Sequence, residues 1–100
     1  MRIAVSYQKG NVYEDFGTAP SFKVYDIENE TIVKSEIIDT LKIEHGALAV
    51  LLDHHNVNLV LSGKISAGSA SALMSNGIHS VSSVSGDADA AVAAYLNNQK

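Results

Sequence analysis

A short apolar run that ends in a glycine turn constrains the fold of this chain more than any other feature. Residues 58–68 read Asn-Leu-Val-Leu-Ser-Gly-Lys-Ile-Ser-Ala-Gly. A continuous apolar run between turn signals is typical of a strand buried on both faces, as in a parallel sheet. Gly63 permits a sharp turn out of this strand, and Ser66 is a candidate N-cap for the helix that follows. The segment predicts an α/β fold built on a strand–turn–helix unit.

Alternating and helical patterns place the other elements. Strands are expected at 2–7, 21–27, 31–38, 58–62 and 78–84, the second and third forming an antiparallel hairpin. Helices are expected at 44–55, 66–76 and 87–97, with Asn56 and Gly77 ending the first two and Asp87 capping the third. The expected inward-facing residues are Leu48, Leu51, Leu52 and His55, then Ala67, Ala70, Leu73 and Met74, then Ala88, Ala91, Val92 and Tyr95.

Helical connections between the first, fourth and fifth strands predict that these strands are parallel. The simplest arrangement is a mixed five-stranded sheet of order 3-2-1-4-5 with helices on both faces, which is the three-layer ribonuclease H-like topology. The length suits one domain over residues 1–100 with a single core. Ligands in such sheets bind outside the carboxyl ends of the strands at a topological switch point, where the polar loop 7–19 and the turn 63–66 should meet.

Composition excludes several classes of function. The chain has no cysteine, so disulfides, thiolate nucleophiles and all-thiolate metal sites are excluded. The net charge is −4 and the basic residues are scattered, which argues against a nucleic-acid interface. No apolar run could span a bilayer, and no long apolar segment follows Arg2 as in a signal peptide, so a cytoplasmic protein without a membrane association is expected.

The polar loop and the turn both carry candidate ligand-binding residues. In Asp15-Phe16-Gly17, the carboxylate is a candidate oxygen donor, but a phenylalanine in the core beside a glycine turn explains the same triplet. In Gly63-Lys64-Ile65-Ser66, helix N–H groups and the lysine could hold an anion, although the glycine spacing of a Walker A loop is missing. An ordinary strand–helix connection explains this second segment equally well.

His45 is the candidate metal ligand among the histidines. It stands at the expected start of a helix, and its imidazole could bind a metal ion together with Asp15 if the two segments converge. A histidine near a helix end with a structural role is the alternative. His54 and His55 point in different directions in the last turn of their helix, and His79 has no partner motif, so structural roles are expected for all three.

Several short segments together resemble a known family. They are Ile3-Ala4-Val5, Asp15 to Pro20 with Phe22 and Tyr25-Asp26-Ile27, Glu44 to Leu48, Ser62 to Ile65, Asn76-Gly77-Ile78, Ser85-Gly86 and Ala94-Tyr95-Leu96. In order and spacing they resemble the nitrogenase iron-molybdenum cofactor biosynthesis family, which includes dinitrogenase accessory factors. The resemblance implies the ribonuclease H-like fold and the non-catalytic binding or carriage of a metal–sulfur cluster, such as the iron-molybdenum cofactor or a precursor.

Two departures from the family leave two functions open. Asp15 stands where many relatives have histidine, and cysteine is absent, whereas iron–sulfur centres favour thiolate ligands. The first function is a carrier of a metal–sulfur cluster or related anionic ligand. The second is a regulatory or scaffold protein that has lost the cluster site and acts through a protein partner. A two-metal nuclease is not favoured, because residues 2–7 contain no carboxylate.

Overall fold

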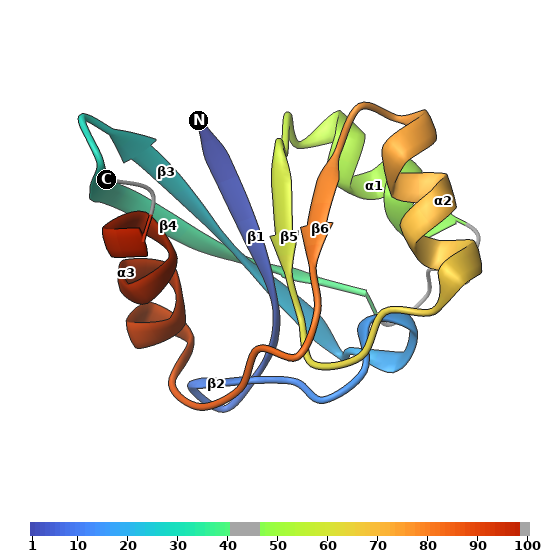
Figure 1. Ribbon diagram of the computed structural model, residues 1–100, viewed down its shortest axis with the longest axis horizontal. Helices are drawn as coiled ribbons and strands as arrows, with labels where there is room; N and C mark the ends of the chain where they lie inside the picture. Colours follow the sequence, from blue (N-terminus) through green and yellow to red (C-terminus); the bar gives the residue numbers. More distant parts are fainter. Residues whose placement is uncertain (41–46, 99–100) are drawn as a thin grey trace.

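Helices cover both faces of a mixed β-sheet in this computed structural model, which describes residues 1–40 and 47–98 (Figure 1). The strands are β1 (Arg2–Gln8), β2 (Asn11–Val12), β3 (Ser21–Glu28), β4 (Thr31–Asp39), β5 (Leu59–Leu61) and β6 (His79–Val81). The helices are the 3₁₀ turn η1 (Phe16–Thr18), α1 (Leu48–His54), α2 (Ala67–Ser75) and α3 (Ala88–Asn98). Helices α1 and α2 lie on one face of the sheet and α3 lies on the other.

The sheet runs in the order β4-β3-β1-β5-β6, and β2 lies off this path and pairs with β1. Strands β1, β5 and β6 are parallel, whereas the β1–β3 and β3–β4 pairs are antiparallel. The five longer strands therefore have the expected order and directions. The sixth strand, β2, was not expected, because its two residues lie in a segment that reads as a polar loop. Lys9 and Gly10 have φ values of 48° and 90°, as in a tight hairpin turn, and they fold the chain back onto β1.

The central strand β5 is buried on both faces, as its continuous apolar sequence predicts. Val60 packs with residues of α1 and α2, whereas Leu59 and Leu61 pack with residues of α3. Strand β3 alternates in the same way: Phe22 joins the first cluster and Tyr25 joins the second. The sheet thus separates two apolar cores, which matches the three-layer arrangement.

Helix α2 corrects part of the predicted packing. Leu73 is buried as expected, but Met74 is 71% exposed and Ala67 is also exposed. The inward side of the helix consists of the buried Leu73 with the half-buried Ala70 and Ala72, and Met74 projects about 100° further around the helix than Leu73. In a helix rich in alanine and serine, the apolar pattern has too little contrast to indicate which side faces inward.

The other two helices follow their patterns more closely. In α1, Leu48 and Leu52 are buried, whereas Leu51 and His55 are only half-buried; the predicted start at residue 44 lies outside the described residues. In α3 the buried stripe consists of Ala88, Val92 and Leu96, with Ala91 and Tyr95 half-buried beside it. Within the described ranges, no helix has the length and apolar character needed to cross a membrane.

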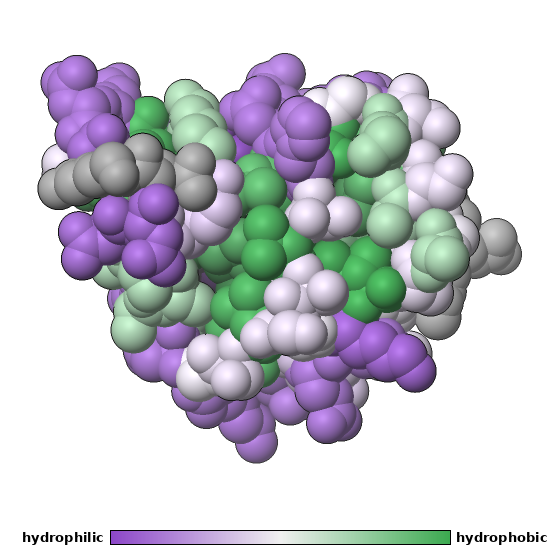
Figure 2. Space-filling model, viewed as in Figure 1, coloured by the Kyte–Doolittle hydropathy of each residue, from purple (hydrophilic) through white to green (hydrophobic). Residues whose placement is uncertain are grey.

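The space-filling view shows how these layers meet the surface (Figure 2). Hydrophobic residues gather in the middle of this face, over the strands between α3 and α2. Hydrophilic residues lie above and below them, and residues of intermediate hydropathy cover the α2 side. Val81, in the edge strand β6, is one of the exposed large apolar residues.

Candidate functional site

Residues 10–16, called the strap below, cross the carboxyl edge of the sheet and are tied down at both ends (Figure 1). At the first end, Asn11 forms a β-bridge with Asp87. The Val12 N–H donates to the Gly86 carbonyl at 2.8 Å, and the Ala88 N–H donates to the Gly10 carbonyl at 3.0 Å. This end of the strap is therefore fixed to the turn that begins α3.

The second end of the strap is fixed to the turn between β5 and α2. Asp15 forms a parallel β-bridge with Lys64. The Lys64 N–H donates to the Glu14 carbonyl at 2.7 Å, and the Phe16 N–H donates to the Lys64 carbonyl at 2.9 Å. The two segments that the topology predicted to meet are thus joined through their main chains.

Gly63 is required at this junction for a reason other than the predicted sharp turn. A Cβ atom added to Gly63 would collide with the main-chain carbonyl of Glu14. Gly63 is also not among the glycines with positive φ, which are Gly10, Gly77 and Gly86. The glycine therefore permits close approach of the strap and does not supply a left-handed backbone conformation.

Two buried hydroxyl groups lie beneath the strap. Ser6, near the end of β1, and Ser62, directly after β5, are both fully buried, and their Oγ atoms are 2.8 Å apart. Ser6 also donates to the main-chain carbonyl of Tyr13 at 2.9 Å. Buried hydroxyl groups need such partners because water cannot reach them. Sequence reasoning missed this pair, whose only signal is a serine ending each of two apolar strands.

The residues of the Asp15-Phe16-Gly17 triplet have different environments. Asp15 is half-buried, and its Oδ2 accepts a hydrogen bond from Thr18 Oγ1 at 2.8 Å. The Phe16 side chain is buried and its ring centroid lies 5.4 Å from that of Phe22. Phe16 therefore anchors the strap in the core, and Gly17 is the next residue of the 3₁₀ turn η1.

The second candidate segment presents a cation at the start of a helix. Lys64 is exposed, whereas Ile65 packs partly against the core. Ser66 caps α2, because its Oγ accepts from the Ser69 N–H at 3.1 Å. A helix N-terminus carries partial positive charge, so the lysine and the first turn of α2 together favour an anion. Glu14, also exposed, adds a nearby negative charge on the strap.

The predicted metal pair of Asp15 and His45 stays a prediction, because His45 lies outside the described residues. Within the part of the chain that is described, no three His, Asp or Glu side chains are grouped as a metal site would require. His54 and His79 are exposed. The His55 carbonyl accepts from Arg2 Nη1 at 2.6 Å, which joins the end of α1 to β1.

A charged cluster on the other face of the sheet was also missed by sequence reasoning. Lys23 Nζ lies 2.8 Å from Asp89 Oδ1, and the Tyr25 hydroxyl donates to the same oxygen at 2.7 Å. Lys23 also lies over the rings of Tyr7 and Tyr25. Burial and the hydrogen bond to Asp89 raise the pKa of Tyr25, while hydrogen bonds from Lys23 and Tyr25 lower the pKa of Asp89. These contacts fix the first turn of α3 to the sheet.

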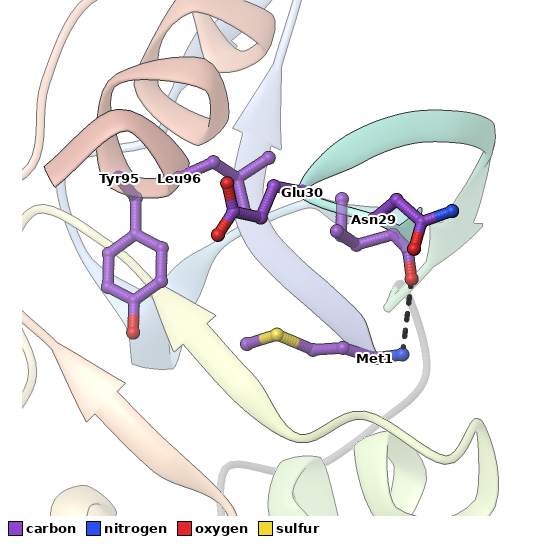
Figure 3. Close-up of a pocket in the computed structure, with 6 residues that line it drawn as sticks. Met1, Asn29, Glu30, Tyr95 and Leu96 are labelled. Carbon is purple, nitrogen blue, oxygen red and sulfur yellow. Dashed lines mark hydrogen bonds between the residues drawn. The ribbon is translucent and has the colours of Figure 1, made fainter. Parts of the chain in front are cut away.

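A separate pocket lies at the opposite end of the sheet, beside the amino end of β1 (Figure 3). Its volume is about 270 Å³, and it is lined by Met1, Ile27, Asn29, Glu30, Tyr95 and Leu96. The terminal amino group of Met1 donates to the Ile27 carbonyl at 3.3 Å. Tyr95 and Leu96 come from the end of α3, so this pocket is not part of the strap region.

Several solved structures have a fold similar to that of this chain. The crystal structure of PH0822 superposes with a TM-score of 0.92 at 28% identity and covers 98% of this chain and 90% of that one. The apo form of the orange protein from Desulfovibrio gigas gives a TM-score of 0.85 at 28% identity, covering 98% and 88%. A protein of Methanocaldococcus jannaschii shares the fold at 18% identity, with a TM-score of 0.79 and coverage of 99% and 90%.

No curated protein matches the chain. A sequence model of the family described as Dinitrogenase iron-molybdenum cofactor, however, matches residues 1–98. The match spans every described strand and helix, including the strap and the start of α2. The chain therefore belongs to the dinitrogenase iron-molybdenum cofactor family.

Proposed function

We propose that this protein is a non-catalytic carrier of an anionic metal–sulfur cluster, such as the iron-molybdenum cofactor or a precursor. The cargo would be held where Lys64 and the first turn of α2 meet the strap. The observation that carries the proposal is the fixed position of Lys64, whose N–H and carbonyl both bond to the strap. Family membership supports the class of cargo. The strand order supports the ribonuclease H-like topology.

The proposed binding of the cluster is mainly electrostatic. Without cysteine the chain cannot offer the thiolates that iron–sulfur centres prefer. An exposed helix N-terminus or lysine stabilises a nearby anion by roughly 0.3–1 kcal/mol each. Such contacts suit a cargo that must be released again. Asp15 would supply an additional oxygen ligand at this edge, and Gly63, Ile65 and Ser66 would shape it. His45, which lies outside the described residues, remains a candidate nitrogen ligand.

Anaerobic titration with isolated iron-molybdenum cofactor tests the proposal. Binding to the native state alone must raise the melting temperature by mass action, and the bound cluster should add visible absorbance to the protein fraction. Lys64→Ala and His45→Ala should each weaken the shift. Lys9→Ala, in the turn that precedes the strap, is the matched control because it also removes an exposed lysine. Its shift should equal that of the unaltered protein.

The scaffold function makes the opposite prediction for the same titration. The carboxylate of Asp15 already accepts a hydrogen bond from Thr18, which would suit a strap that is only structural. A protein that stays colourless and unshifted at saturating cofactor contradicts the carrier function for this cargo. Recovery of a stoichiometric protein partner by the unaltered chain, lost in Lys64→Ala, would then support a scaffold acting through the same edge.

A further inference from the structure

Strand β4 is a long and exposed sheet edge. It has nine residues, and among residues 1–40 and 47–98 it pairs on one side only, with β3. Val33 and Ile37 are 53% and 56% exposed, and the opposite edge strand β6 has only three residues. An edge strand presents unpaired N–H and C=O groups that can pair with another strand. Covering the two exposed apolar side chains of this edge would also be favourable, because it removes them from water.

The sequence of β4 is complementary to itself in the antiparallel direction. When two copies pair about a twofold axis at Ser35, Lys34 faces Glu36 of the second copy. In the same register, Ile37 of the second copy lies opposite the β-bulge residue Val33, so both exposed apolar side chains lie along the interface. The symmetry produces each contact twice. Opposite charges and paired apolar side chains stabilise antiparallel strands when they lie directly opposite each other.

The two adjacent symmetric registers lack this complementarity. An axis at Lys34 would place this lysine opposite its own copy, and an axis at Glu36 would do the same for the glutamate. Like charges directly opposite each other destabilise a strand pair. The charge pattern therefore favours the register centred on Ser35.

The two charged side chains are suitably placed for this contact. Lys34 is 72% exposed, with Asp26 at 4.0 Å as a neighbour within the chain. Arg2 Nη2 at 2.8 Å and His55 Nδ1 at 3.9 Å both approach Oε1 of Glu36, so the carboxylate is held in position before any second copy arrives. Val33 is a β-bulge residue without a partner on β3, but pairing with β3 is regular from Lys34 to Asp39, the stretch that holds both charged residues.

We propose that two copies of this chain associate through β4 and form one continuous sheet centred on Ser35. This inference does not rest on the carrier function. Because the two β4 strands run antiparallel, the carboxyl edges of the two sheets point in opposite directions. The two straps then lie at opposite ends of the dimer, and neither blocks the other.

Sedimentation equilibrium over a range of protein concentrations and salt concentrations tests this association. The unaltered chain should dimerise reversibly, and more weakly at high salt because the central pairs are ionic. Lys34→Glu and Glu36→Lys should each weaken the dimer about tenfold. Their mixture should form a heterodimer as tight as the unaltered dimer, since each chain then offers the charge that the other lacks. Melting curves of each variant check folding, because Glu36→Lys also loses its contact with Arg2.

A cysteine placed on the proposed axis gives an independent readout. The natural chain has none, so Ser35→Cys would carry a single thiol that faces its own symmetry mate. Mild oxidation should convert this variant to a disulfide-linked dimer. Ser71→Cys, which is also exposed but lies on α2, is the matched control and should stay uncrosslinked. A monomer at every concentration, a mixture that fails to restore association, or equal crosslinking at position 71 would each overturn the proposal.

Discussion

Ser6 and Ser62 lie 56 residues apart in the chain, yet they form a hydrogen bond 2.8 Å long at the buried ends of β1 and β5. Since the single Ser6 proton goes to the Tyr13 carbonyl, the Ser62 hydroxyl must be the donor between the two serines. Ser62 therefore donates to Ser6, and Ser6 donates to the strap. This short relay couples the two central strands to the segment that carries Asp15.

The relay predicts unequal effects for two similar substitutions. Ser6→Ala leaves the Ser62 hydroxyl without its acceptor and the Tyr13 carbonyl without this donor, so it should lower the free energy of unfolding by about 1–3 kcal/mol. Ser62→Ala leaves the bond from Ser6 to Tyr13 intact and should cost about 1 kcal/mol or less. Urea denaturation measures both values. Equal losses would contradict the assigned proton direction.

Two glycines near the start of α2 should respond to alanine in opposite directions. Gly63→Ala places a methyl group against the Glu14 carbonyl and should destabilise the protein by about 1–3 kcal/mol while loosening the strap. Gly68→Ala meets open space within the helix and should stabilise it by roughly 0.5 kcal/mol. Thermal melting compares the two variants. A tolerated Gly63→Ala would show that the strap can move away from this turn.

A substitution in the turn between β1 and β2 should stabilise the protein. Lys9 has a φ of 48° and precedes Gly10, so it occupies a left-handed position that a lysine adopts at a cost. Lys9→Asn creates the favoured Asn-Gly turn and should raise the free energy of unfolding by about 0.5–1 kcal/mol. Lys9→Ala keeps the strained backbone and should change it little. Denaturant titration distinguishes them, and equal stabilities would mean that the turn carries no strain.

Acid should remove the contribution of Asp89. Hydrogen bonds from Lys23 and then Tyr25 lower its pKa in the folded state. The stabilisation is therefore present above the unfolded pKa, near 4, and is lost as the pH falls through the folded value. Asp89 is largely exposed, so solvent screening limits the effect to about 1 kcal/mol. Asp89→Asn should be less stable than the unaltered chain at pH 7, and this gap should shrink in urea titrations toward pH 2. A constant gap would contradict this origin.

Much of the fold could be predicted because local patterns carry the necessary information. Leu59 to Leu61 are apolar on both sides of the strand, and they are buried on both faces. Asn56 and Gly77 end their helices with φ values of 60° and 74°, as their sequence positions indicated. The prediction that Met74 faces inward was wrong because α2 consists mostly of alanine and serine. Its sequence therefore shows no clear difference between an apolar and a polar side.

Part of the candidate site could also be predicted from the sequence, and part could not. Topology predicted that the polar loop and the β5–α2 turn meet, and the Asp15–Lys64 bridge joins them. Sequence reasoning did not find the strap, its contact with Gly86, or the Ser6–Ser62 pair. It also assigned Gly63 to a turn, whereas close approach of the Glu14 carbonyl explains it.

The sequence by itself determined the layers, the order of the five longer strands and where α1 and α2 stop. Apolar patterns and helix stops depend on neighbouring residue types, and helical crossovers between parallel strands have one hand. Only the tertiary structure decided how residues 10–16 close the carboxyl edge. That closure is made of main-chain hydrogen bonds from Val12 to Gly86 and from Lys64 to Glu14. Every residue except proline carries the same main-chain donor and acceptor, so such contacts leave no pattern in the side chains.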